Sequence, residues 1–123
     1  MIGITEPEVL SRAWMEIAGD LGLPARASDA AIRAALREAD HLAEDTYDVP
    51  AALLFALGRN ARAFSGFRAM SILVIEWHTK TLGMKLEASR AELADLLGRV
   101  AVRERSYEDV RSWIGARLLA FGG

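Results

Sequence analysis

The sequence predicts an all-α protein made of one domain, residues 1–123, in which about six helices surround a buried central helix. Apolar residues recur at helical spacing along nearly the whole chain, and the alternation typical of strands never extends beyond a few residues. A chain of 123 residues that is 52% hydrophobic is large enough to form one core. Residues 67–82 are apolar on most sides, and such a helix packs inside the others, so we expect it at the centre.

Start and stop signals predict the first three helices. Thr5 before Glu6-Pro7-Glu8 is a helix start, and Gly22-Leu23-Pro24 ends that run. Ser28-Asp29 begins a second helix, and residues 45–48 form a polar connector before a third helix, which begins at Pro50 and ends near residue 63. The apolar stripe of the first helix consists of Leu10, Trp14, Ile17 and Leu21. That of the second consists of Ile32, Ala35, Leu36, Ala39 and Leu42, and that of the third of Leu53, Leu54 and Leu57.

Three further helices follow a short break at residues 64–66. The fourth covers residues 67–82 and ends at Gly83. Ser89-Arg90-Ala91-Glu92 is a capping-box pattern that begins a fifth helix, and Ser106 begins a sixth. On the fourth helix we expect burial of Ile72, Leu73, Ile75 and Trp77. The stripes of the fifth and sixth consist of Leu93, Leu96, Leu97 and Val100, and of Tyr107, Val110, Ile114, Leu118 and Phe121.

Composition excludes several classes of function. The absence of cysteine removes disulfides, thiolate zinc sites and cysteine nucleophiles, and a net charge of −2 argues against a nucleic-acid partner. His41 and His78 are 37 positions apart and have no second ligand at metal-binding spacing, so we expect no metal site. The longest aliphatic run is too short to span a membrane and the N-terminus lacks a signal-peptide pattern, which favours a cytoplasmic protein with no membrane partner. Capping explains the acidic pairs Glu44/Asp45 and Glu108/Asp109.

One segment, residues 59–68, combines three arginines with no acidic residue. It connects the third predicted helix to the fourth, and the backbone N–H groups of Gly66, Phe67 and Arg68 would face the gap between them. Together with Arg62, these groups could bind an anion. The alternative is that the arginines at the end of the third helix simply interact favourably with the dipole of that helix.

The same segment carries a resemblance to a known family. Leu53–Asn60 is an apolar helix ending in asparagine, Gly66 follows in a loop, and Ser71–Trp77 and Leu82–Leu86 form the next helix and its end. In this order and spacing the chain resembles the Doc branch of the Fic/Doc (Fido) family. The resemblance implies a small, all-helical fold of the kind found in toxins that are nucleotidyl- or phosphotransferases.

This chain departs from the family at the residues that perform the reaction. The family's catalytic histidine falls on Ala61, its loop phenylalanine on Ala63 and its metal-binding acid on Ser65, whereas Gly66 matches the loop glycine. The phosphate-contacting asparagine, lysine and arginine fall on Phe67, Arg68 and Ala69, so only the basic side chain of Arg68 matches. Loss of a general base lowers a rate by about 10²–10⁴, and loss of the metal acid removes the main electrostatic stabilisation. We therefore expect no catalytic residue and no transferase activity.

The resemblance implies a degenerate Doc-like protein of toxin–antitoxin type that acts by binding a protein partner, such as an antitoxin-like helix. We expect no cofactor; a nucleotide bound with Mg²⁺ is the alternative. Two other functions stay open. One is an active transferase that has relocated its catalytic groups to Glu76, His78, Arg62 and Arg68, and the other is a generic helical adaptor.

Overall fold

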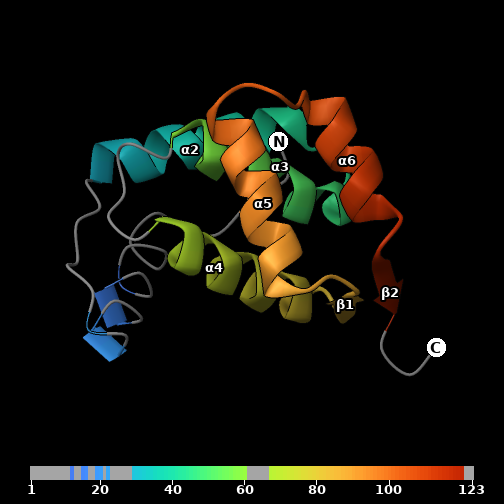
Figure 1. Cartoon of the computed structure of the whole chain (residues 1–123), viewed down its shortest axis with the longest axis horizontal. Helices are drawn as coiled ribbons and strands as arrows, with labels where there is room; N and C mark the ends of the chain where they lie inside the picture. The colour runs from blue at the N-terminus through green and yellow to red at the C-terminus, as the bar shows by residue number, and fades with distance from the viewer. Residues whose placement is uncertain are drawn as a thin grey trace.

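The computed structural model describes residues 29–60 and 67–120, together with positions 12, 15, 16, 19, 20 and 22; at positions 29, 31, 32, 67–70, 77 and 120 it describes the backbone only. These residues are mostly helical, which confirms the all-α class, and they include one small two-stranded sheet (Figure 1). The elements are α2 (Asp29–Leu42), the 3-10 helix η1 (Thr46–Asp48), α3 (Val49–Arg59), α4 (Phe67–Thr81), β1 (Met84–Leu86), α5 (Arg90–Ala101), α6 (Tyr107–Gly115) and β2 (Leu118–Ala120).

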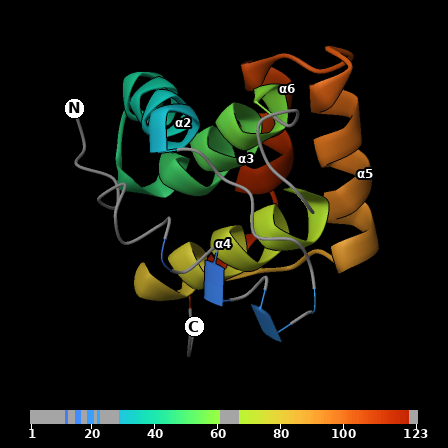
Figure 2. The same ribbon diagram turned by 90° about the vertical axis from the view of Figure 1, so that its left-hand side faces the viewer.

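Helix α3 lies at the centre of the described structure. It contacts α2, α4, α5 and α6, and every residue from Val49 to Gly58 is buried. Figure 2 shows α3 beside α2, with α4 below it and the α5–α6 pair on the side opposite α2. Burial on all sides follows from the sequence VPAALLFALG, which has no polar side chain to expose.

The expectation that the fourth predicted helix is central is therefore wrong. Helix α4 buries one face, while Lys80 and Thr81 are exposed, and Glu76 and His78 are partly exposed. Charged and polar residues along the second half of α4 favour one solvated side, so the helix covers the core instead of crossing it. The buried residues of α4 are Ser71, Ile72, Val74, Ile75 and Thr79.

The burial predicted for individual α4 residues is confirmed in part. Ile72 and Ile75 are buried, as expected, whereas Leu73 is only half-buried. The side chain of Trp77 lies outside the described residues, as does the helix expected between residues 5 and 21 except for a few isolated positions. In α2, which begins at Asp29 as predicted, Ala35, Leu36 and Ala39 face the core.

Local capping signals correctly predicted where α5 and α6 begin. Ser89 Oγ accepts a hydrogen bond from the backbone N–H of Glu92 at 3.1 Å, and Ser106 Oγ accepts one from that of Asp109 at 3.2 Å. Each acidic residue accepts a bond from its serine N–H in return, which completes a capping box at both helices.

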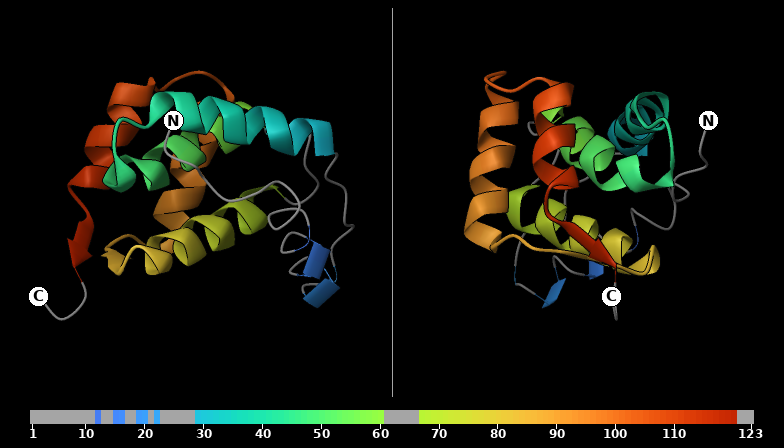
Figure 3. Two further views of the ribbon diagram at one scale, coloured as in Figure 1. Left: turned by 180° about the vertical axis from the view of Figure 1, so that it is seen from behind. Right: turned by 90° about the vertical axis from the view of Figure 1, so that its right-hand side faces the viewer.

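The predicted sixth helix is too long at its C-terminal end. Helix α6 ends at Gly115, and Leu118 lies in β2, which pairs antiparallel with β1 so that Leu118 is opposite Leu86 (Figure 3). Glycine has a low helix propensity, and the pairing with β1 satisfies the backbone groups that a further helical turn would have satisfied. A strand of three residues is too short for its alternation to stand out in the sequence. Phe121, expected on the same helix face, lies outside the described residues.

Candidate functional site

The predicted loop site falls mostly outside the described residues. This applies to Ala61, Arg62, Ala63, Ser65 and Gly66, whereas Phe67, Arg68 and Ala69 form the first turn of α4. The structure thus describes the two helix ends that the loop connects.

The polar side chains at the C-terminal end of α3 are held by contacts with α3 itself and with α2. Asn60 Nδ2 donates to the carbonyl oxygen of Ala56 at 2.7 Å and to Glu38 Oε2 on α2 at 3.4 Å. The Arg59 guanidinium lies over the Phe55 ring, 5.4 Å from its centroid. Arg59 is therefore engaged by its own helix, which favours the structural interpretation of this arginine.

The side chains proposed for a relocated active site lie on the second half of α4. Glu76 Oε1 is 3.2 Å from Arg90 Nη2, an ion pair that joins α4 to α5. His78 is half-buried, and burial lowers the pKa of its imidazole below the usual value. Glu76 is nine residues beyond the start of α4, or about 13 Å along the helix axis. The described residues contain no group of three or more His, Cys, Asp or Glu side chains that could hold a metal ion.

An ion-pair cluster that the sequence did not reveal joins α6 to the start of α3. The carboxylate of Asp48, a residue that is 9% exposed, accepts from Arg111 Nε at 3.0 Å and from the backbone N–H of Glu44 at 3.1 Å. Arg111 also lies 3.6 Å from Glu44 and 4.0 Å from Glu108. Asp48 and Arg111 are 63 residues apart, so no local pattern could pair them.

Tyr107 lies at the edge of this cluster. Its ring packs edge-on against Phe55 with centroids 5.8 Å apart. Burial, and then the nearby Asp48 carboxylate, raise the pKa of the phenol to about 12. Since Asp48 and Arg111 already satisfy one another and the phenol stays protonated at neutral pH, the cluster is structural in character.

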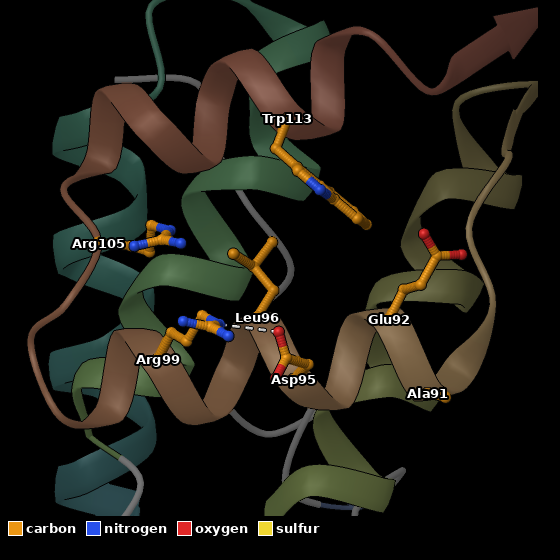
Figure 4. A pocket seen from close by; sticks show the side chains of 7 residues that line it. All are labelled: Ala91, Glu92, Asp95, Leu96, Arg99, Arg105 and Trp113. Atoms are coloured by element: carbon orange, nitrogen blue, oxygen red, sulfur yellow. Dashed lines mark hydrogen bonds and ion pairs between the residues drawn. The ribbon is translucent and has the colours of Figure 1, made fainter.

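A groove lies between α5 and α6 (Figure 4), with a volume of about 370 Å³. Volumes of this size are typical of ligand sites. Figure 4 shows Arg99 and Arg105 at one end of the groove, Glu92 toward the other, and Leu96 and Trp113 between them. The complete lining consists of Ala91, Glu92, Asp95, Leu96, Arg99, Arg105 and Trp113.

The two arginines at the basic end differ in how they are paired. Arg99 is shared between Asp95, at 2.8 Å, and Glu104, at 3.3 Å. In the described part of the chain Arg105 forms no ion pair, and its Nη1 donates to the backbone carbonyl of Glu104 at 3.1 Å. Arg105 therefore presents the less neutralised positive charge of the two.

The other parts of the groove are fixed by contacts within α5 and α6. The capping bonds from Ser89 lower the pKa of Glu92, which keeps its carboxylate ionised. The Trp113 ring is half-buried and stacked by Arg117, whose guanidinium carbon lies 3.9 Å from the ring centroid. The groove thus has a fixed apolar floor with a basic end and an acidic end.

Among the described residues, no helix combines the length and the apolar character needed to cross a membrane.

Comparison of the chain with models of known protein families, with curated proteins and with solved structures finds no match. The resemblance to the Doc branch therefore stays a prediction.

Proposed function

We propose that this chain is a degenerate Doc-like protein, with a Fido-like arrangement of its helices, that binds a protein partner and transfers neither AMP nor phosphate. The observation that carries the proposal is the composition of one segment of the chain. Between Arg59 and Ile75 the sequence contains no histidine and no acidic residue, although this is the segment in which the family places both its base and its metal-binding acid.

The missing groups determine what the loop can do. The methyl group of Ala61 cannot take the proton of a target hydroxyl, and the Ser65 hydroxyl carries no charge to hold Mg²⁺ at neutral pH. Arg62, Arg68 and the N–H groups of Gly66, Phe67 and Arg68 are the remaining candidate anion-binding groups. We expect at most weak affinity for phosphate there, because the bulky side chain of Phe67 takes the place of the phosphate-contacting asparagine.

Two features of the described structure are consistent with the proposal. The apolar helix α3 precedes α4 in the chain, which is the order that the resemblance implies. The structure also contains the α5–α6 groove, a concave surface with a tryptophan and two arginines, residue types enriched where proteins bind each other. The alternative active site gains no such support, because Glu76 is engaged with Arg90 across two helices.

A gain-of-function experiment tests the proposal. The wild-type chain and a variant that restores the family loop (Ala61→His, Ala63→Phe, Ser65→Asp, Phe67→Asn, Arg68→Lys and Ala69→Arg) are incubated with Mg²⁺, candidate protein targets and ATP labelled at the α- or γ-phosphate. We expect no labelled protein with the wild type and labelling with the restored variant.

Two other outcomes would contradict parts of the proposal. Labelling by the wild type contradicts the absence of transfer, and its loss on Arg68→Ala would assign the activity to the loop. A restored variant that keeps the wild-type circular dichroism spectrum but labels nothing contradicts the Doc-like register. Lys85→Ala, a substitution of an exposed residue in β1, serves as a control for preparation effects.

A further inference from the structure

We propose that the α5–α6 groove binds an amphipathic helix of the protein partner that presents an acidic, an apolar and a basic side chain in succession along one face. The inference rests on the proposed function only in expecting a protein partner. It goes beyond that function by naming the surface and the chemistry of the segment bound.

The order of charges in the groove sets the order of charges in the occupant. In the described part of the chain Arg105 has no carboxylate within ion-pair distance, and the nearby Asp109 carboxylate accepts the Ser106 N–H of the α6 capping box. An incoming carboxylate can therefore pair with Arg105 without breaking an ion pair. Glu92 stands toward the other end and remains ionised, so a lysine or arginine of the occupant is favoured there. The occupant must therefore run with its acidic residue toward Arg105 and its basic residue toward Glu92.

The floor between these charges accepts one apolar side chain. Leu96 is 5% exposed and Trp113 is held half-buried by the guanidinium of Arg117, so both surfaces are already ordered before binding. Ordered aromatic surface loses little conformational entropy when it is covered. A volume of about 370 Å³ accommodates a large apolar side chain together with the stems of its charged neighbours, with the partner backbone lying along the opening.

The spacing of the groove residues indicates a helix. Glu92 and Arg99 are seven residues apart on α5, or about 10 Å along the axis, and Arg99 lies at the same end of the groove as Arg105. Side chains at positions i, i+4 and i+7 of a second helix lie on one face and span the same length. A helix with an acid at i, leucine at i+4 and lysine at i+7 therefore matches the basic end, the apolar floor and the acidic end in one register.

The test uses a fluorescein-labelled, end-blocked peptide with Glu, Leu and Lys at i, i+4 and i+7 in an alanine-rich helical background, titrated with the full chain and followed by polarisation. A second peptide exchanges Glu and Lys, and a third replaces Leu by Ala. We expect saturable binding of the first peptide, about fivefold or more weaker binding of the exchanged one, and about thirtyfold weaker binding of the alanine peptide.

Substitutions in the protein locate the binding. The variant Arg105→Glu should bind the first peptide about fivefold or more weakly than the wild type does. It should also bind the exchanged peptide more tightly than the first, a reversal of preference that loss of structure cannot produce. Glu92→Gln removes the charge but keeps a residue able to complete the capping box. Arg37→Glu, on the exposed side of α2, is the matched control and should bind as the wild type does.

Three results would overturn the inference. They are no saturable binding of the first peptide, equal affinity of the wild type for the first and the exchanged peptide, and unchanged binding by Arg105→Glu. None of them bears on transfer, because the labelling assay reports on residues 61–69 and the peptide titration reports on the groove. The two proposals can thus fail separately.

Discussion

Helix α3 has no polar side chain between Val49 and Gly58, whereas α5 and α6 carry a charged residue on nearly every turn. Apolar packing on all sides stabilises α3. The α5–α6 pair instead combines one apolar stripe with capping boxes and exposed ion pairs, and its outer side forms the groove. The difference indicates that burial is most complete in α3, whereas the exposed sides of α5 and α6 carry charged residues that can change without disturbing the core.

The largest effect is expected where α3 touches α5. A Cβ atom at Gly58 would lie 2.7 Å from Val100 Cγ1, a contact too close for either helix to accept unchanged. Gly58→Ala should lower the free energy of unfolding by about 1–3 kcal/mol, measured by urea denaturation. Gly115→Ala is the matched control, because no atom lies within 4 Å of its Cβ, and it should leave the protein as stable or more so. Equal destabilisation by both would contradict the close packing of α3 on α5.

A smaller loss is expected at the cluster that joins α6 to the start of α3. Asp48→Ala removes the acceptor of Arg111 Nε and of the backbone N–H of Glu44. We expect the free energy of unfolding to fall by about 1–2 kcal/mol. The loss is smaller than for a fully buried ion pair, because Arg111 is partly exposed and still has Glu44 and Glu108 nearby. Asp95→Ala, which breaks an exposed ion pair, should change stability much less.

A gain in stability is expected at the turn between α5 and α6. Arg103 has φ 65°, and the backbone N–H groups of Arg103 and Glu104 bond to the carbonyls of Val100 and Arg99 in a Schellman arrangement that favours glycine. Arg103→Gly should therefore raise the free energy of unfolding by up to about 1 kcal/mol. A decrease would show that the arginine side chain contributes more than its backbone strain costs.

The smallest effect is a pH dependence at α4. Burial lowers the pKa of His78 below its unfolded value of 6.5, so the unfolded state binds the proton more readily. The contribution of His78 is full above pH 6.5, decreases as the pH falls below it, and levels off below the folded pKa. His78→Gln should flatten the stability profile in this window, as measured by thermal unfolding at several pH values; an unchanged slope would assign the dependence to other groups.

The sequence alone predicted those features that depend on local signals. The starts of α5 and α6 follow from Ser89 and Ser106 and the acidic residues three positions later, and these boundaries agree with the structure. The start of α3 was also predicted well, since proline is favoured in the first turn of a helix, whereas its end was expected near residue 63 and lies at Arg59.

Features that depend on tertiary contacts were missed. Hydropathy alone suggested that residues 67–82 are central, because it did not weigh Glu76, His78 and Lys80 against the uninterrupted apolar run of α3. The pairing of β2 with β1, the Asp48–Arg111 contact and the groove each join residues distant in sequence, which no local pattern encodes. The predicted loop site remains a sequence-based hypothesis.

Hydrogen exchange read by mass spectrometry on the full chain tests the central claim most directly, because it reports where ligands bind. The chain is measured alone, with the Glu–Leu–Lys peptide, and with ATP and Mg²⁺. We predict that the peptide slows exchange in segments covering residues 91–113, that ATP and Mg²⁺ leave residues 59–70 unchanged, and that α3 is the slowest helix throughout. Protection of residues 59–70 by ATP and Mg²⁺, with no effect of the peptide on residues 91–113, would contradict the account.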